Sequence, residues 1–345
     1  MRNHHHLPSL RSIILVIDAL DGHIIHALQL SPRASFRLIA DTVDAPEQTV
    51  ARRYHRLRRD GALRVVGVPN PRVHGDAQWV VRVHAKPDDM PRLVDALVRR
   101  PEVTHANILS GWSELVCVVR APLTEGPDGL LGRLPRTTSV IDLDVDLILH
   151  TFGEAGTEPW TAYGHTLDPD QVRRVLERST PASPAVRPAA PTAEDQPLFD
   201  ALAADGRAPH SRLAHDTGWS TPRVVRRLTA LEAAGTLTYD LDVLPQRLGF
   251  EVNAMIWLTT APRHLDGVGR QIAAHAEIAS VAALSGQNNL MAIAICRDVR
   301  HLYGYLSGKF AAVEHIRSYD VSIRAQRLKQ TASLISRGRL VHAGA

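Results

Sequence analysis

The chain has 345 residues, of which 44% are hydrophobic, and a formal net charge of +4. That length and composition predict a soluble protein of two to four domains and exclude a membrane span, because the longest early apolar run covers only residues 13–17. Cys117 and Cys296 lie in apolar runs at unmatched positions, so we expect no disulfide, no cysteine metal site and a cytoplasmic location.

The first predicted domain is a helix-turn-helix over residues 18–66, after an N-terminal tail of residues 1–17. Apolar residues at helical spacing predict one helix around Ile24 and a second at Ile39–Ala40. A third helix is expected to open near residues 44–46, where Asp44 can cap it, and to close at Gly61. The third helix of such a unit is the one that would read DNA.

The next predicted domain covers residues 79–150 and alternates strands with helices. Strands are expected at 79–85, 103–109, 115–119 and 141–147, and helices at 89–100 and 129–134. This β-α-β-β-α-β order is typical of a ferredoxin-like sandwich.

The chain then repeats this plan. Residues 24–63 superpose without a gap on residues 198–237, a shift of 174 positions, and Leu109-Ser110-Gly111 matches Leu284-Ser285-Gly286 one position further on. Such a repeat indicates a tandem duplication. The predicted fold class is therefore α+β, with two copies of a winged or three-helix helix-turn-helix domain, each followed by a ferredoxin-like βαββαβ domain.

The remaining boundaries follow from the repeat and from composition. Residues 151–191 are expected to form a linker with a short helix, because residues 179–192 are rich in Pro, Ala, Ser and Thr. The second copy comprises a helix-turn-helix domain at 192–240 and a ferredoxin-like domain at 250–330. Residues 331–345 are predicted to be a C-terminal tail.

The third helix of copy one carries a cationic face. At 100° per residue, Gln48, Arg52, His55, Arg56 and Arg59 lie opposite the apolar stripe of Val50, Tyr54 and Leu57. Arginines in such a row can neutralise DNA phosphates, while the N-terminal residues of the helix meet base edges in the major groove. The alternative is a solvated surface helix. The predicted DNA-binding residues of copy one are Glu47, Gln48, Thr49, Arg52, Arg53, Arg56 and Arg59.

The third helix of copy two is less basic. Ala230 and Ala233 stand where copy one has Arg56 and Arg59, so we expect copy one to supply more of the sequence-independent affinity for DNA. Arg53 and Arg227 lie at the edge of the apolar stripe, where a structural role is an equal alternative to DNA contact. The predicted DNA-binding residues of copy two are Ser220, Thr221, Arg223, Arg226 and Arg227.

A glycine-containing turn joins two predicted strands in each copy. Glycine suits a positive φ or a close approach, and the polar groups beside it could bind a small zwitterion, although a plain hairpin explains the glycine equally well. The candidate effector residues are Ser110, Gly111, Trp112, Ser113 and Glu114 in copy one and Ser285, Gly286, Gln287, Asn288 and Asn289 in copy two. No metal spacing, phosphate loop or nucleophile elbow is present, so we expect no enzyme activity, catalytic residue, metal or cofactor.

In this order, the motifs resemble the leucine-responsive regulator/AsnC (Lrp/AsnC) family of transcription factors in a tandem form. Copy one shares the opening pattern of Asp18, Asp21, Ile24, Ile25 and Leu28, and its third helix shares Thr49-Val50, Arg53, Leu57 and Gly61. Copy two shares Asp205-Gly206-Arg207, Leu213-Ala214, Gly218, Ser220, Arg227, Leu231-Glu232 and Gly235.

The resemblance implies a DNA-binding regulator that senses an amino acid or related metabolite near Ser110-Gly111 and Ser285-Gly286. The acidic residue that the family places three positions after the glycine is Glu114 in copy one, but copy two has Asn289. The family pairs through its sheets, which implies an internal pseudo-dimer that presents two non-identical readers to duplex DNA and a homo-oligomer built through the ferredoxin-like domains.

Two other accounts remain open. Siroheme decarboxylase subunits resemble this family, and Leu248-Gly249-Phe250, Asn253, Met255 and Trp257 resemble their entry into the sandwich. Against this alternative, no His cluster for a tetrapyrrole recurs between the copies. A chain that has lost DNA binding and serves only as an assembly partner is the third possibility.

Overall fold

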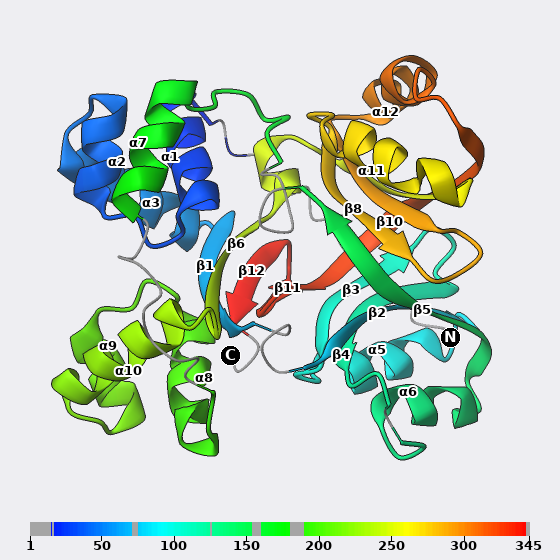
Figure 1. The fold of residues 1–345 in the computed structure, drawn as a ribbon, viewed down its shortest axis with the longest axis horizontal. Coiled ribbons are helices and arrows are strands. Elements are labelled where there is room, and N and C mark those ends of the chain that lie inside the picture. The colour runs from blue at the N-terminus through cyan, green and yellow to red at the C-terminus, as the bar shows by residue number, and fades with distance from the viewer. Residues whose placement is uncertain are drawn as a thin grey trace, which may run out of the picture.

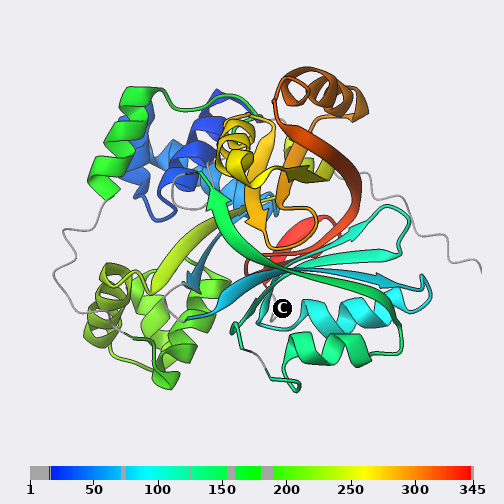
Figure 2. The ribbon, with the colours of Figure 1, turned by 45° about the vertical axis from the view of Figure 1, so that its right-hand side comes forward.

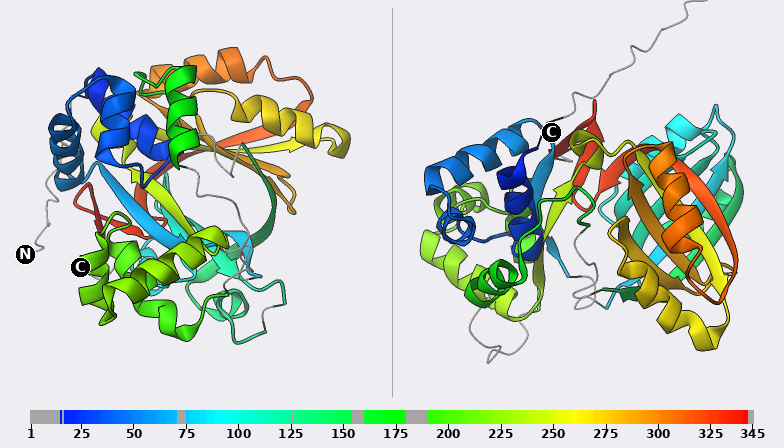
Figure 3. Two further views of the ribbon diagram at one scale, coloured as in Figure 1. Left: turned by 60° about the vertical axis from the view of Figure 1, so that its left-hand side comes forward. Right: turned by 90° about the horizontal axis from the view of Figure 1, so that it is seen from above.

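The computed structural model describes residues 15, 17–70, 75–124, 126–153, 160–179 and 190–342. Two helical domains lie on one side of the molecule and a β-barrel lies on the other (Figure 1). A two-stranded ribbon runs between them, as the view from above shows (Figure 3). Most of the predicted linker residues 179–191 and most of the tail 1–17 fall outside the described residues.

Each helical domain has three helices at the predicted positions. Copy one has α1 (Ala19–Leu30), α2 (Phe36–Val43) and α3 (Glu47–Arg59), and copy two has α8 (Gln196–Ala204), α9 (His210–Thr217) and α10 (Thr221–Ala233). The predicted stripe of Val50, Tyr54 and Leu57 is fully buried in the copy-one core. Asp44 does not cap α3: it ends α2 with a φ of 51°, and Pro46 occupies the N-cap of α3.

The segment after the first barrel half belongs in part to the first helical domain. α7 (Pro169–Ser179) packs against α1 and α2, and Val175 is fully buried there. Trp160 and Tyr163 join the same core. The predicted short helix of the linker is therefore a fourth helix of this domain, because its apolar face covers the surface that α1 and α2 leave open.

One strand follows each helical domain, and these two strands pair with each other. β1 (Leu63–Pro69) runs antiparallel to β6 (Leu237–Val243), with Leu63 opposite Val243 and Pro69 opposite Leu237. The pairing of equivalent strands relates the two helical domains by an approximate two-fold axis.

The barrel combines four strands from each copy. Copy one provides β2 (Ala77–Ala85), β3 (Val103–Leu109), β4 (Glu114–Ala121) and β5 (Val140–Phe152), and copy two provides β7 (Val252–Thr260), β8 (Ile278–Leu284), β9 (Leu290–Cys296) and β10 (Ile316–Gln330). Within each copy the strands lie in the order last, first, third, second. β5 continues onto β8, and β10 continues onto β3, which closes all eight strands into one barrel (Figure 2).

The closed barrel differs from the two separate sandwich domains expected from the sequence. Helices α5 (Met90–Val98) and α6 (Leu130–Arg133) cover the copy-one half, and α11 (Leu265–Ala273) and α12 (Val299–Tyr305) cover the copy-two half. β5 is longer than predicted because its residues 148–152 pair with β8 of the other copy. Residues 324–329 of β10 pair in the same way with β3. The barrel interior holds apolar side chains from both halves, namely Val80, Leu109, Val116, Met255, Trp257, Ala282, Leu284 and Met291.

The prediction of a C-terminal tail at residues 331–345 is wrong over most of that range. Residues 331–342 form a β-hairpin of β11 (Ser333–Ser336) and β12 (Arg339–His342), and β11 pairs with the end of β10. Leu340 is buried, which anchors the hairpin. Across the described residues, none of the helices combines the length and apolar character that a bilayer span requires.

Candidate nucleic-acid interface and effector turns

The exposed face of α3 contains Gln48, Arg52, His55 and Arg59, which we call the reader face. Arg59 keeps 74% of its side chain exposed, and its nearest carboxylate oxygen, on Asp60, lies 3.9 Å away. The Arg52 side chain has no hydrogen bond or ion pair to any described residue. Glu47 is also exposed and Thr49 is half-buried. The geometry therefore leaves the predicted base-contacting end of the helix open to solvent.

Arg56 does not lie on the open face as predicted. Its Nη2 contacts Oδ2 of Asp21 at 2.5 Å, and the Asp21 side chain is completely buried. Arg53 donates to the same oxygen at 3.3 Å and pairs with Asp18 at 2.8 Å. The periodicity placed Arg56 correctly around the helix axis, but a buried carboxylate on α1 draws its head inward, since an unpaired buried charge is costly.

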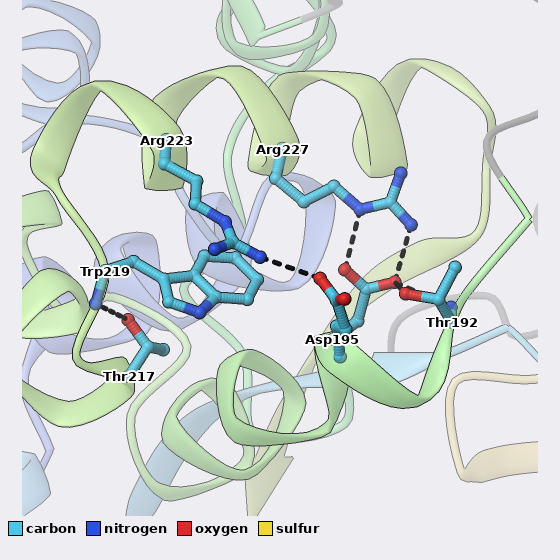
Figure 4. A network of polar contacts seen from close by, with 7 residues as sticks. Thr192, Asp195, Thr217, Trp219, Arg223 and Arg227 are labelled. Carbon is cyan, nitrogen blue, oxygen red and sulfur yellow. Dashed lines mark hydrogen bonds and ion pairs between the residues drawn. The ribbon is translucent and has the colours of Figure 1, made fainter.

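The same anchor recurs in copy two. Asp195 lies 174 positions after Asp21, and Arg227 lies 174 positions after Arg53. Arg227 donates to the two carboxylate oxygens of Asp195 at 2.7 and 2.5 Å, as Figure 4 shows. Arg53 therefore holds α3 against α1, and Arg227 holds α10 against the segment before α8. Both arginines make a structural contact, and DNA contact by them stays a prediction.

A capping box positions each of these acids, at the start of α1 in copy one and at the start of the short 3-10 helix Ala193–Asp195 before α8 in copy two. Asp18 accepts a hydrogen bond from the Asp21 backbone at 3.0 Å, and the Thr192 backbone donates to Asp195 at 2.7 Å. Burial alone would raise the pKa of Asp195, but its hydrogen bonds from Arg227 and Thr192 outweigh burial and lower it. The sequence analysis did not identify this role, although the spacing of three between each cap and its acid was a visible signal.

Copy two offers a smaller cationic surface. Ser220 and Thr221 are exposed at the start of α10. The Arg226 side chain is also exposed, and it has no hydrogen bond or ion pair to any described residue. Arg223 is also exposed, but it pairs with Glu194 at 2.9 Å and lies over the Trp219 ring at 4.2 Å (Figure 4). Ser220 occupies the N-cap position of α10 without a side-chain capping bond.

The two helical domains also contact each other directly. Arg58 on α3 pairs with Asp205 of copy two at 2.8 Å. Arg207 donates to the Pro32 carbonyl at 2.8 Å and lies over the Phe36 ring at 4.7 Å. These contacts, together with the shared ribbon, fix the distance between the two readers.

Each predicted effector turn lies against the last strand of the other copy. The Ser110 hydroxyl donates to the Ile323 carbonyl at 2.9 Å, and the Ser285 hydroxyl accepts from the Leu147 amide at 2.9 Å. The two glycines serve different needs. Gly111 has a φ of 89°, whereas a Cβ on Gly286 would lie 2.0 Å from Oδ1 of Asp146. Both turns are therefore placed where the copies meet.

The polar groups of the two turns are committed differently. In copy one, Glu114 is buried and accepts from Arg82 at 2.8 Å, and Arg82 lies over the Trp257 ring at 4.3 Å. His84 Nε2 is 3.8 Å from the same carboxylate, and the Trp112 side chain is half exposed. Arg82 and His84 were not identified from the sequence, because only strand pairing brings β2 beside Glu114.

In copy two, Asn289 replaces the acid and is used structurally. Its amide donates to the Thr260 carbonyl at 2.9 Å, and its oxygen accepts from the Thr260 amide at 3.0 Å. Gln287 accepts from Thr259 through its backbone carbonyl at 3.2 Å. Ser113, Gln287 and Asn288 have at least part of their surface open to solvent. In the described part of the chain, no group of three or more His, Cys, Asp or Glu side chains could hold a metal ion.

Comparison with known proteins agrees with this geometry. The profile of the AsnC-type helix-turn-helix domain matches residues 17–58, and that of the Lrp/AsnC ligand binding domain matches residues 253–334. The HTH-type transcriptional regulator LrpA of Pyrococcus abyssi is 26% identical over 136 residues, which are 96% of its own length. Residues 17–58 and 253–334 therefore match the helix-turn-helix and ligand binding domain models of the Lrp/AsnC family.

The relatives also support the duplication. The match to LrpA covers only 39% of this chain, so a nearly complete relative corresponds to one of its two copies. An uncharacterised HTH-type transcriptional regulator of the same organism is 31% identical over 101 residues, 29% of this chain and 64% of the relative. The crystal structure of the siroheme decarboxylase NirDL superposes on this chain with a TM-score of 0.53 and 16% sequence identity. The superposition covers 91% of this chain and 93% of the NirDL chain. That likeness extends over both copies and concerns the fold alone.

Proposed function

We propose that the protein is a sequence-specific DNA-binding transcriptional regulator that responds to a small metabolite. The observation that carries the proposal is the reader face of α3, where Arg52 and Arg59 stay exposed although Arg53 and Arg56 are paired inside. Exposed guanidinium groups along a helix whose N-terminus is open to solvent suit phosphate contacts beside a base-reading segment. The AsnC-type helix-turn-helix match over the same residues supports this function.

The two readers would contact DNA unequally. Arg52 and Arg226 are equivalent, exposed and available to phosphates in both copies. Glu47, Gln48 and Thr49 differ from Thr221, Pro222 and Arg223 at the matching positions. Two related but different readers, held by the β1–β6 ribbon, suit an imperfect palindrome rather than an exact one.

The proposal is tested by DNA binding at several salt concentrations. Each phosphate contact contributes roughly 0.9 to the slope of log Kobs against log salt. We expect Arg52→Ala and Arg226→Ala each to lower the slope by about that amount, whereas Arg92→Ala, an exposed arginine on α5, leaves it unchanged. Absence of binding to the protein's own promoter region in dilute buffer would refute the proposed function.

We also propose that the copy-one turn is the effector site. Glu114 and Arg82 provide one negative and one positive group in contact, which suits the ammonium and carboxylate of an amino acid or a related metabolite. The copy-two turn is less suited, because the Asn289 side chain is already hydrogen-bonded to the backbone of Thr260. A screen of amino acids for changes in DNA affinity tests this site, and Glu114→Gln is expected to abolish the response without loss of DNA binding. A response that survives in this variant would place the effector elsewhere.

Assembly is the remaining part of the proposal. We infer that each barrel half is a ferredoxin-like unit and that the chain forms a homo-oligomer through these units, as the Lrp/AsnC ligand binding domain match suggests. Light scattering with and without effector measures the oligomeric state. A monomer at all concentrations would contradict this inference.

The siroheme decarboxylase alternative is favoured by one observation, the fold likeness to NirDL over both copies. The barrel interior is occupied by apolar side chains, including Met255 and Trp257, which leaves the alternative without an assigned pocket there. An absorbance titration with siroheme separates the two functions. Tight binding with product formation favours the enzyme, and salt-sensitive DNA binding favours the regulator.

A further inference from the structure

The C-terminal hairpin is fixed to the end of the reader helix. The Leu340 amide donates to the Gly61 carbonyl at 3.1 Å, and the Arg339 guanidinium donates to the Arg59 carbonyl. Gly61 has a φ of 70°, and a Cβ there would lie 2.7 Å from the Arg339 Cβ. The hairpin and the last turn of α3 therefore form one continuous surface.

This surface encloses a basic hollow of about 470 Å³. Its basic lining residues are Arg58, Arg59, Arg64, Arg337, Arg339 and His342, of which the five arginines carry the charge. Asp205 neutralises Arg58, but Arg64 and Arg339 bond to backbone carbonyls, which carry no net charge. The Arg337 guanidinium has no hydrogen bond or ion pair to any described residue. The hollow thus retains a surplus of positive charge.

The turn at the tip of the hairpin holds an arginine where the backbone disfavours one. Ser336 pairs with Arg339, and the two residues between them, Arg337 and Gly338, have φ values of 49° and 67°. Such two-residue turns favour Asn-Gly, because asparagine and glycine tolerate positive φ. The left-handed conformation is unfavourable for other residues, because it brings their Cβ close to the following carbonyl oxygen. The exposed guanidinium is therefore held at the tip against the local backbone preference, which motivates a functional role.

The hollow continues the reader face. Gln48, Arg52, His55 and Arg59 follow one another along α3, and Arg59 is both the last residue of that row and part of the hollow. Copy two has Ala233 in place of Arg59. The arrangement therefore gives the copy-one reader a basic extension that begins at a residue the copy-two reader lacks.

We propose that this hairpin is a wing that binds backbone phosphates of duplex DNA, with Arg337, Arg339 and Arg59 as the contacting cations. The proposal rests on the proposed DNA-binding function and adds a contact outside the helix-turn-helix. Because the guanidinium groups face phosphates rather than base edges, the wing adds affinity without sequence preference. It also makes the two readers unequal by more than their helix sequences.

Arg337→Asn is the sharpest test. Asparagine removes the charge and tolerates the turn, so the melting temperature should not fall. The salt slope is expected to decrease by about 0.9, equally on promoter DNA and on unrelated DNA, since a phosphate contact is blind to sequence. Arg337→Lys should retain most of the slope, and Arg92→Asn on α5 is the matched control.

The outcomes separate the wing from the proposed function. If the wild-type protein binds DNA and Arg337→Asn leaves the slope unchanged, the wing is refuted while the regulator stands. If the wild type does not bind DNA at all, the proposed function fails first. Calorimetry with tripolyphosphate in the absence of DNA adds a further arm: binding lost in Arg337→Asn, with no change in the DNA slope, would assign the hollow to a small anion and overturn the wing.

Discussion

Arg227 donates two hydrogen bonds to Asp195, one to each carboxylate oxygen. The Asp195 side chain is only 2% exposed, so the pair joins the third helix of copy two to the short segment before its first helix. Copy one repeats the arrangement with Arg53 and Asp21, and there Arg56 adds a second guanidinium. Duplicated arginines on a reader helix therefore divide into those that hold the domain together and those that remain available to DNA.

Removal of the Arg227 side chain should destabilise the second helical domain. Arg227→Ala leaves the buried Asp195 carboxylate without its partner, and breaking a buried ion pair typically costs about 3–5 kcal/mol. Thermal unfolding followed by circular dichroism measures the loss. Arg226→Ala is the matched control, because the neighbouring side chain is exposed and unpaired in the described chain, and it should leave stability unchanged. Equal melting temperatures for the two variants would contradict the assignment.

Arg56 and Arg59 should separate stability from DNA affinity. Arg56→Ala removes one of the cations beside the buried Asp21, so we expect a loss of about 1–3 kcal/mol in stability. Arg59→Ala removes an exposed charge and should lower the salt slope of DNA binding by about 0.9 with little effect on unfolding. Denaturant titration and fluorescence anisotropy measure the two effects. A slope that falls in Arg56→Ala but not in Arg59→Ala would reverse these roles.

Asp242 should make stability fall with rising pH. It lies in the ribbon opposite Arg64 and is completely buried. No described group lies in good hydrogen-bonding geometry to its oxygens, although the Ser333 and Thr331 hydroxyls face it and oppose the rise of its pKa. Burial, and then the neighbouring Asp240, raise the pKa of Asp242 to about 8, while Arg64 opposes the shift. Arg327 also faces it. The folded protein therefore keeps a proton that the unfolded chain releases near the ordinary value of 3.8.

The sign follows from this difference in bound protons. Between pH 4 and pH 8 the folded state binds more protons, so the contribution of Asp242 to stability is lost as pH rises to about 8. Asp242→Asn cannot ionise, and we expect it to exceed the wild type at pH 8.5 by at least about 1.4 kcal/mol, the equivalent of one pKa unit. Unfolding at pH 5 and pH 8.5 measures this. Parallel pH profiles for the two proteins would show that Asp242 is charged in the folded state.

Gly269 should be intolerant of a side chain because it marks a contact between the copies. On α11 of copy two, a Cβ at this position would lie 2.3 Å from the Phe152 ring, which comes from the last strand of copy one. We expect Gly269→Ala to destabilise the protein by about 1–3 kcal/mol through overpacking. Gly267→Ala, on the same helix with open space around it, should be neutral or stabilise by about 0.5–1 kcal/mol. Similar effects of the two substitutions would contradict this packing.

The sequence by itself determined the duplication, the three helices of each reader domain and the succession of strands and helices along each half of the barrel. Local periodicity carries this information, because Val50, Tyr54 and Leu57 share one helix face whatever surrounds them. It also placed Ser110-Gly111 and Ser285-Gly286 in turns between strands. The duplication is visible in the sequence as a repeat, and the other features depend on neighbours within a few residues.

Only the tertiary structure decided which charges stay free and how the copies join. Arg56 and Arg59 are both arginines near one end of α3, yet the partner that distinguishes them, Asp21, lies 35 residues before Arg56. The closed barrel, the Arg82–Glu114 pair and the hairpin beside Gly61 likewise depend on strands that are distant in the chain. Ion pairing and strand register depend on distances in space, and a single sequence does not contain those distances.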